Sequence, residues 1–166
     1  MLFSVNKTAA YLRLSREDGD KLESDSIKNQ RALIKEFIDH HSGFNYVDEY
    51  VDDGYSGTSY ERPAFQRLIE DIKKGKVNCI VVKDLSRFGR NYIEVGRYLE
   101  MIFPMLNVRF IAINDNIDSI GNPESVNNAI VAFKNIMNDE YCRDISNKVR
   151  SVLTNKRRQG KFIGSF

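Results

Sequence analysis

The stretch TAAYLRLS, residues 8–15, decides how the rest of the sequence is interpreted. Its first five residues are small or apolar, which is typical of a buried strand, and a charged residue and a hydroxyl residue come where the strand ends. Side chains two residues apart on a strand point to the same face of the sheet. The stretch therefore predicts that Arg13 and Ser15 lie side by side at the end of the first strand.

Short apolar segments alternate with segments of helical periodicity. The expected strands are residues 8–14, 45–51, 78–83 and 108–114. The expected helices are residues 26–41, 63–75 and 91–103, the last closed by Pro104. Such alternation is typical of an α/β fold, here with a mainly parallel sheet of four to five strands flanked by helices.

The last part of the sequence predicts one long helix. Its apolar residues recur every three or four positions, at Val126, Ile130, Phe133, Met137, Tyr141, Ile145, Val149 and Val152. A helix of roughly 35 residues spans about 50 Å, which is longer than a small domain, so its second half must project or pair with another chain. We therefore expect an α/β core over residues 1–122, a long C-terminal interface helix over 123–160, and the start of a linker over 161–166.

Charge is unevenly distributed along the 166 residues, although the net charge is only +2. Residues 143–166 hold seven Lys/Arg and one acidic residue, whereas the other 142 residues hold 18 Lys/Arg and 22 Asp/Glu. A basic C-terminal segment on an acidic body indicates a polyanionic partner, and a solvated helix face is the alternative interpretation.

Cysteine usage and hydropathy exclude several classes of protein. The two cysteines form no CxxC pair, so we expect neither a disulfide framework nor a zinc site, and Cys79 lies in an apolar run typical of a core. No apolar stretch approaches the roughly 18 residues of a membrane span, and the N-terminus lacks the apolar core of a signal peptide. We expect a soluble, cytoplasmic protein with reduced cysteines and no membrane association.

Polar residues follow three of the expected strands, where sites form in an open α/β sheet. The third strand leads into KDLSRFGR (residues 83–90), in which Arg87 and Arg90 are neighbours if the segment is helical. The second leads into DDGYSG (residues 52–57), with Asp53 and Ser56. Taken singly, these residues also fit a helix cap, a turn cap or ordinary surface charges.

Three arginines and a serine at one sheet edge suit the attack of a serine hydroxyl on a phosphodiester. Arginine is permanently charged and binds phosphate oxygens through two parallel hydrogen bonds. A phosphoryl transition state spreads negative charge over its equatorial oxygens and needs cations already in place. Because arginines can supply this charge, we expect no metal and no other cofactor.

Four motifs occur in order along the chain. They are Tyr11-Leu12-Arg13-Leu14-Ser15, Ser26-Ile27-Lys28-Asn29-Gln30, Asp53-Gly54-Tyr55-Ser56-Gly57 with Arg62-Pro63, and Ser86-Arg87-Phe88-Gly89-Arg90. Together they resemble the catalytic domain of serine recombinases of the resolvase/invertase superfamily over residues 8–160. The KDLSRFGR form and the ending QGKFIG (residues 159–164) are similar to the large serine recombinases, which are encoded by transposons or phages.

The resemblance implies DNA recombination through a 5′-phosphoserine intermediate, followed by strand exchange within a tetramer and religation, without metal or ATP. It makes Ser15 the nucleophile, and it places Arg13, Arg87 and Arg90 on the scissile phosphate. It also implies supporting roles for Tyr11, Gln30, Asp53, Ser56, Arg62 and Ser86. Small resolvases commonly carry aspartate at the position of Ser86, so the role of a carboxylate there does not transfer. Asp84, two residues earlier, is a candidate substitute, unless the turn from strand to helix directs it elsewhere.

The same resemblance gives the last helix two tasks. Its apolar stripe implies a homodimer or homotetramer, and its basic residues imply contact with double-stranded DNA, through Lys148, Arg150, Lys156, Arg157, Arg158 and Lys161.

Rival hypotheses come from other classes of protein. One is a DNA-binding regulator that has lost catalysis, which the complete set of Arg13, Ser15, Arg87 and Arg90 disfavours. Another is a serine hydrolase, which needs a histidine base, yet His40 and His41 lie at the expected end of a helix. A third is a nucleotide-binding domain, but the sequence contains neither a GxGxxG motif nor a Walker A loop.

Overall fold

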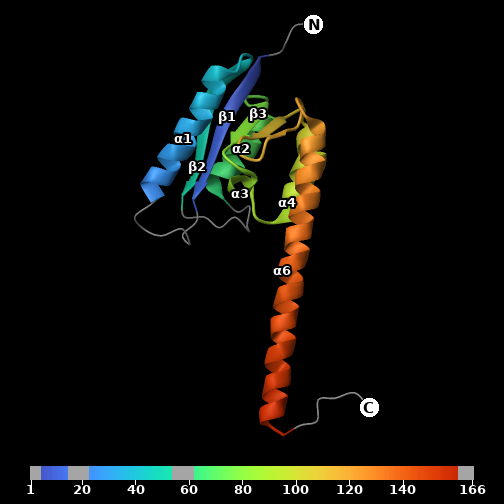
Figure 1. The fold of residues 1–166 in the computed structure, drawn as a ribbon. Helices are drawn as coiled ribbons and strands as arrows, with labels where there is room; N and C mark the ends of the chain where they lie inside the picture. The colour runs from blue at the N-terminus through green and yellow to red at the C-terminus, as the bar shows by residue number, and fades with distance from the viewer. Residues whose placement is uncertain (1–4, 15–22, 54–61, 161–166) are drawn as a thin grey trace. The chain divides into compact units, whose positions relative to one another are not determined.

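A computed structural model of the protein describes residues 5–14, 23–53 and 62–160. Within it the chain forms two compact units, residues 1–130 and residues 131–166 (Figure 1). The first unit contains the sheet, the helices that cover it and the first turns of the last helix. The second contains the remainder of that helix.

The first unit is built on a five-stranded sheet with the order β2-β1-β3-β4-β5. The strands are β1 (Asn6–Leu14), β2 (Phe44–Asp53), β3 (Cys79–Val82), β4 (Arg109–Ala112) and β5 (Ile117–Asp118). Neighbouring strands are parallel except for the short β5, which is antiparallel to β4. The expectation of a mainly parallel sheet of four to five strands is therefore confirmed.

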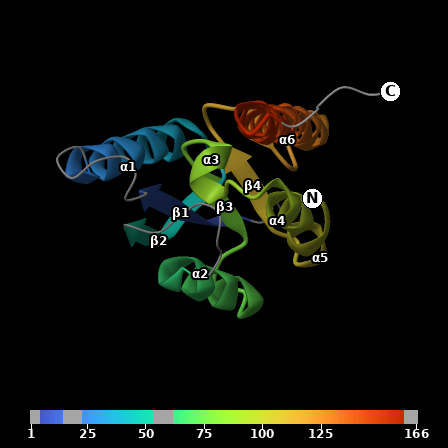
Figure 2. The same ribbon diagram turned by 90° about the horizontal axis from the view of Figure 1, so that it is seen from below.

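Helices cover both faces of this sheet. They are α1 (Glu23–His40), α2 (Pro63–Lys73), α3 (Leu85–Phe88), α4 (Tyr92–Arg97), the π-helical turn η2 (Tyr98–Ile102), α5 (Phe103–Met105) and α6 (Pro123–Arg158). Figure 2 shows α1 on one face of the sheet, with α2, α4 and α5 on the other. The chain thus forms the flanked α/β sheet that its alternating pattern predicts.

The prediction that Pro104 closes a single helix over residues 91–103 is wrong. The helical path continues through Pro104 to Met105, and a π-helical turn comes before it. In that turn the N–H of Phe103 donates to the carbonyl of Tyr98, five residues earlier. In this wider turn the regular backbone hydrogen bond to the residue four positions earlier is absent. Proline cannot donate such a bond, so the ring of Pro104 is accommodated without ending the helix.

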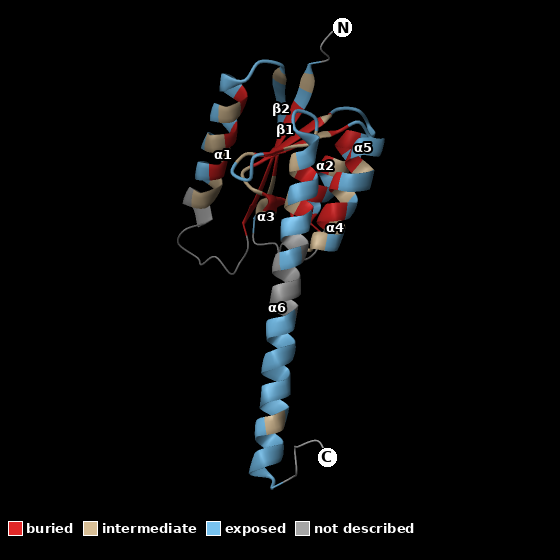
Figure 3. Cartoon of the chain, turned by 45° about the vertical axis from the view of Figure 1, so that its right-hand side comes forward, coloured by how far each residue is buried: buried red, intermediate tan, exposed pale blue. Residues whose placement is uncertain are grey.

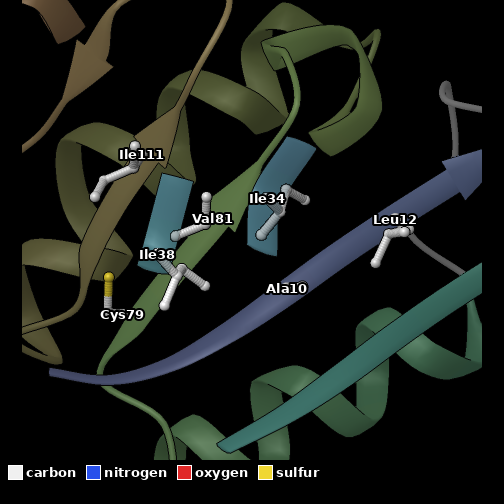
Figure 4. Packing of buried hydrophobic residues seen from close by; sticks show 7 residues of the cluster. All are labelled: Ala10, Leu12, Ile34, Ile38, Cys79, Val81 and Ile111. Atoms are coloured by element: carbon white, nitrogen blue, oxygen red, sulfur yellow. The ribbon is translucent and has the colours of Figure 1, made fainter. Parts of the chain in front are cut away.

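Each face of the sheet has its own core. Toward α1 lies an aliphatic cluster formed by Ala10, Leu12, Ile34, Ile38, Cys79, Val81 and Ile111 (Figure 4). Toward α2 and α4 lie aromatic rings, among them Phe65, Phe88 and Phe110, with the centroids of Phe65 and Phe88 5.6 Å apart. Cys79 is a core residue as expected, and burial raises the pKa of its thiol to about 12. Figure 3 shows buried residues concentrated on the strands and on the inward sides of the helices.

The long C-terminal helix forms as the periodicity predicts, since α6 runs without interruption over 36 residues. Val126 and Ile130, in the first unit, are buried. In the second unit Ile145, Val149 and Val152 are 43%, 50% and 52% exposed within the single chain. The side chains of Phe133, Met137 and Tyr141 are not among those that the structure describes. Among the described helices, none is long and apolar enough to cross a membrane.

The turn between β5 and α6 is organised by the carboxylate of Asp118. It accepts two hydrogen bonds from Arg109, at 2.9 and 2.6 Å, and two from the N–H groups of Ile120 and Gly121, at 3.1 and 2.9 Å. Although burial raises the pKa of Asp118, these hydrogen bonds from Arg109 and the backbone outweigh burial and hold it below its usual range. The carboxylate therefore joins β4 to the start of α6.

We predict that Gly121→Ala destabilises the protein by about 1–3 kcal/mol. A Cβ at this position would overlap a carboxylate oxygen of Asp118 and lie 3.3 Å from Nη2 of Arg109, so the ion pair would have to move. Urea denaturation measures the effect. The matched control is Gly96→Ala in α4, where a Cβ meets only Oε2 of Glu100 at 3.7 Å, and a gain of about 0.5–1 kcal/mol is expected there. Equal effects of the two substitutions would contradict the assigned role of this turn.

Candidate active site

Strands β1, β2 and β3 are parallel, so their carboxyl ends lie at one edge of the sheet. Leu14, the last residue of β1, pairs with Asp53, the last residue of β2, and β3 leads directly into α3. Ser15 follows Leu14 immediately but lies outside the described residues, as does Ser56. The sheet therefore brings together the segments that the sequence singled out.

Arg13 is fully buried and binds the backbone of α3. Its Nη2 donates to the carbonyl of Ser86 at 2.9 Å, and its Nε donates to that of Arg87 at 3.2 Å. In return, Nη1 of Arg87 donates to the carbonyl of Arg13 at 3.4 Å. The end of β1 and the helix α3 are thus joined by three hydrogen bonds.

Gln30, which is also fully buried, reaches the same residue from α1. Its Oε1 accepts a hydrogen bond from the backbone N–H of Arg13 at 3.4 Å, and its Nε2 donates to the carbonyl of Arg13 at 3.3 Å. An amide side chain is suited to this because it carries both a donor and an acceptor. Gln30 therefore fixes the backbone of β1 two residues before Ser15.

Arg62 is the second buried arginine and binds α3 from the start of α2. Its Nη2 donates to the carbonyl of Phe88 at 2.8 Å, and its guanidinium lies 4.8 Å from the ring centroid of Phe65 and 5.5 Å from that of Tyr11. Two guanidiniums thus bind the carbonyls of three consecutive residues, 86–88. A short helix has unpaired carbonyls at its C-terminal end, and these two cations satisfy them.

The arginines lie close enough for their charges to act on one another. Burial and the positive charges of Arg62, Arg90 and Arg87 together lower the pKa of Arg13 to about 10, although Tyr11 acts in the opposite direction. Burial also raises the pKa of Tyr11, so this phenol stays protonated. The edge of the sheet therefore concentrates positive charge where β1 ends.

At the end of β2 the buried carboxylate is that of Asp52, which sequence analysis did not single out. Asp52 is 1% exposed and accepts from the Tyr11 hydroxyl at 2.9 Å and from the N–H groups of Ala64 and Phe65 at 3.0 and 2.9 Å. Asp53, the expected residue, is exposed. The two-residue period of a strand could have shown this difference, because Asp52 shares a face with the buried Tyr50.

Asp84 is the N-cap of α3, and its carboxylate accepts hydrogen bonds from residues of that helix. Its Oδ1 accepts from the hydroxyl of Ser86 at 2.5 Å and from the N–H of Arg87 at 3.2 Å. Arg87 and Arg90 are not neighbours on one helix, because α3 ends at Phe88 and Gly89 is extended. Both arginines, like Ser86, are half-buried.

The expected DNA-contacting residues of α6 lie on the surface. Lys148, Arg150, Lys156, Arg157 and Arg158 are exposed, whereas Lys161 lies outside the described residues. Lys148 forms an ion pair with Asp144 at 2.6 Å, one turn earlier. Within residues 5–14, 23–53 and 62–160 no three His, Cys, Asp or Glu side chains are grouped in a way that could hold a metal ion.

The model of the family "Resolvase, N terminal domain" matches residues 8–162 of the sequence, nearly the whole chain. The chain belongs to the resolvase family. A putative DNA recombinase of Bacillus subtilis (strain 168) is 37% identical to this resolvase-family chain over 83 residues, which are 49% of the chain and 15% of that protein.

Two solved structures are similar to this resolvase-family domain over most of its length. The N-terminal catalytic domain of TP901-1 integrase is 28% identical with a TM-score of 0.63, over 83% of this chain and 97% of that one. A resolvase family site-specific recombinase from Streptococcus pneumoniae is 28% identical with a TM-score of 0.62, over 90% of this chain and 97% of that one. The fold expected from the resemblance is thus confirmed.

The two histidines of this resolvase domain lie at the wrong end of the sheet for a serine hydrolase. His40 ends α1, and the ring of the adjacent His41 stacks on Phe37 at 4.2 Å between centroids. Both come just before β2 begins, at the edge opposite to the ends of β1 and β2. They cannot act as base for a serine that follows β1.

We predict that Arg62→Lys destabilises the domain by about 2–3 kcal/mol, because an ammonium keeps the charge but loses the flat stacking and the bond to Phe88. Arg67→Lys is the matched control. Arg67 also stacks on a tyrosine, 4.7 Å from the ring centroid of Tyr50, and donates to the carbonyl of Glu49 at 3.1 Å, but it is exposed. Its replacement should cost no more than about 0.5 kcal/mol in the same denaturation experiment. A smaller cost at Arg62 than at Arg67 would overturn the structural assignment.

Proposed function

We propose that this resolvase-family chain is the catalytic domain of a site-specific serine recombinase that cleaves and rejoins double-stranded DNA with Ser15 as nucleophile. The observation that carries the proposal is the junction of β1 with α3. Arg13, two residues before Ser15, binds the backbone of the helix that presents Arg87. The charges of Arg62 and Arg90 also act at Arg13. The strand that leads into Ser15 and the helix that carries Arg87 are thus joined through Arg13.

The proposed chemistry is a pair of reversible transesterifications. The Oγ of Ser15 forms a bond to the phosphorus, the bond from phosphorus to the 3′-oxygen breaks, and the oxygen leaves as a 3′-hydroxyl. The product is a 5′-phosphoserine that retains the energy of the phosphodiester, so religation needs no ATP. The half-buried Arg87 and Arg90 would bind the equatorial oxygens of the transition state. Arg13 would add its charge to theirs while its described bonds hold α3.

We propose a division of tasks along the chain. Residues 1–122 would carry the chemistry, residues 123–160 would serve oligomerisation and the approach to DNA, and residues 161–166 would begin a linker. The half-exposed Ile145, Val149 and Val152 fit contact with a second copy in a dimer or tetramer. The exposed basic residues of α6 fit DNA phosphates, which they would contact without reading the sequence.

Substitution of Ser15 tests this function. The full-length protein would be incubated with labelled DNA fragments drawn from either side of its own gene, and protein joined to 5′ ends would be separated under denaturing conditions. We expect Ser15→Ala to abolish this adduct and to leave DNA binding unchanged, because the side chain contributes one hydroxyl to binding and the whole nucleophile to chemistry. Ser42→Ala, an exposed serine before β2, is the control that should react normally.

Either of two results would reject the proposal. Adduct of undiminished yield from Ser15→Ala would mean that another residue attacks the DNA. DNA binding without any adduct from the unaltered protein would instead favour a regulator that binds DNA on the same fold.

Replacing a candidate arginine by lysine tests whether its geometry matters as well as its charge. We predict that Arg87→Lys lowers the rate of adduct formation by roughly 10²–10³, the typical cost of removing one positioned donor to a transition-state oxygen. Single-turnover measurements at saturating DNA provide the rate. Arg97→Lys in α4, where the arginine lies on the surface near Glu94, is the control. A rate for Arg87→Lys within twofold of the unaltered protein would make Arg87 an ordinary surface charge.

A further inference from the structure

We infer that Asp52 is a positioning residue for the proposed reaction, joining β1, β2 and α2 so that the two buried arginines hold α3 in place. The inference rests on the proposed function for its kinetic consequence, but not for its structural one. Asp52 touches neither the reacting serine segment nor α3 in any described contact, so it would act through Tyr11 and the start of α2.

The first step is the unusual cap of α2. The residue at the N-cap position is Arg62, whose side chain makes no capping bond because its guanidinium is directed to α3. Asp52, ten residues earlier in the chain, supplies the missing acceptor to the N–H groups of Ala64 and Phe65. The carboxylate thus fixes the start of α2, and with it the backbone position of Arg62.

The second step is the hydrogen bond to Tyr11. The same oxygen, Oδ2, that accepts from Phe65 also accepts from the Tyr11 hydroxyl at 2.9 Å. The Tyr11 ring lies beneath the guanidinium of Arg62, and on the same strand Arg13 points to the same face two residues later. One buried carboxylate therefore sets the position of both arginines.

The third step is electrostatic. Asp52 is 1% exposed, and burial of a carboxylate is costly unless hydrogen bonds and nearby cations offset it. Here three hydrogen-bond donors offset that cost, and Tyr11, which donates one of these bonds, also lies under the guanidinium of Arg62. Removal of the charge would loosen the arginines that bind residues 86–88, and so move Arg87 relative to Ser15.

The chain offers a closely matched control at the other end of α2. Tyr50 donates to the buried Asp71 at 2.8 Å, a tyrosine–aspartate bond of the same kind between β2 and α2. Asp71 also pairs with Lys76 at 3.0 Å, and it lies near the opposite edge of the sheet. A substitution there removes a similar amount of stability without reaching α3.

The experiment compares Asp52→Asn with Asp71→Asn in the full-length protein, below the temperature at which either variant begins to unfold. We expect Asp52→Asn to slow adduct formation at saturating DNA by about tenfold to 10²-fold, the range typical of small misplacements of catalytic groups. DNA affinity should stay within twofold. Asp71→Asn should change neither quantity by more than twofold. Equal slowing by both substitutions, or by neither, would overturn the inference.

Tyr11→Phe separates positioning from loss of fold if Asp52→Asn proves unstable. It removes one hydrogen bond only, and Tyr50→Phe is its control. In the double variant Tyr11→Phe/Asp52→Asn the two rate effects should be less than multiplicative, since both act through one contact. Fully multiplicative effects would mean that Asp52 does not act through Tyr11, contrary to the inference.

Hydrogen exchange of the protein without DNA distinguishes failure of this inference from failure of the proposed function. Loss of a helix cap typically costs about fivefold, and Asp52→Asn should pass this loss from the start of α2 to α3 through Arg62. Exchange of the amides in α3 should therefore be roughly fivefold faster in Asp52→Asn and unchanged in Asp71→Asn. If the unaltered protein forms no adduct, the recombinase proposal fails, and this measurement alone decides whether Asp52 positions α3. Unchanged exchange in α3 would reject the positioning role.

Discussion

The binding of three consecutive carbonyls in α3 by two buried guanidiniums is the constraint on which the rest of the site depends. A helix of four residues has almost no stability of its own, because nucleation fixes several residues for a single hydrogen bond. Arg13 and Arg62 bring positive charge to its C-terminal carbonyls, and Asp84 caps its start. Tertiary contacts therefore hold in place a helix that could not form alone.

This arrangement gives buried arginines a structural task in addition to any contact with substrate. A guanidinium has five donors in a fixed plane, so one side chain can bind protein carbonyls and still present N–H groups elsewhere. Burial makes the cations costly, as the lowered pKa of Arg13 indicates. The buried cations thus lower the stability of the fold at the edge where the proposed catalysis needs concentrated positive charge. Such a loss of stability is common at functional sites.

Sequence patterns predicted the fold well where local periodicity and global packing agree. The four parallel strands and α6 follow directly from such patterns, and Arg13, Arg87 and Asp53 lie at the expected edge. Elements without a pattern escaped prediction. Strand β5 has two residues, and the π-turn before Pro104 depends on a widened bond that no propensity encodes.

Non-local contacts were the other limit of prediction. Asp52 caps a helix that begins eleven residues later and accepts from a tyrosine 41 positions earlier, so neither contact leaves a local signal. Arg62 was expected in a supporting role through resemblance, but its stacking and its bond to Phe88 depend on how the sheet and helices meet. Period-two reasoning along β2 would have recovered the burial of Asp52, though not its partners.

The interior place of β1 in the sheet, between β2 and β3, has a consequence for how the chain acquires its structure during synthesis. This strand is synthesised before the other four strands of the sheet, yet it pairs on one side with residues 44–53 and on the other with residues 79–82. Parallel pairing over such separations requires closure of long loops before any contact is gained, so it is slow. The side of β1 that pairs with β3 therefore stays unpaired until β3 has been synthesised. Until then the nascent chain has an incomplete sheet, and this interval is when a chaperone would be of most use.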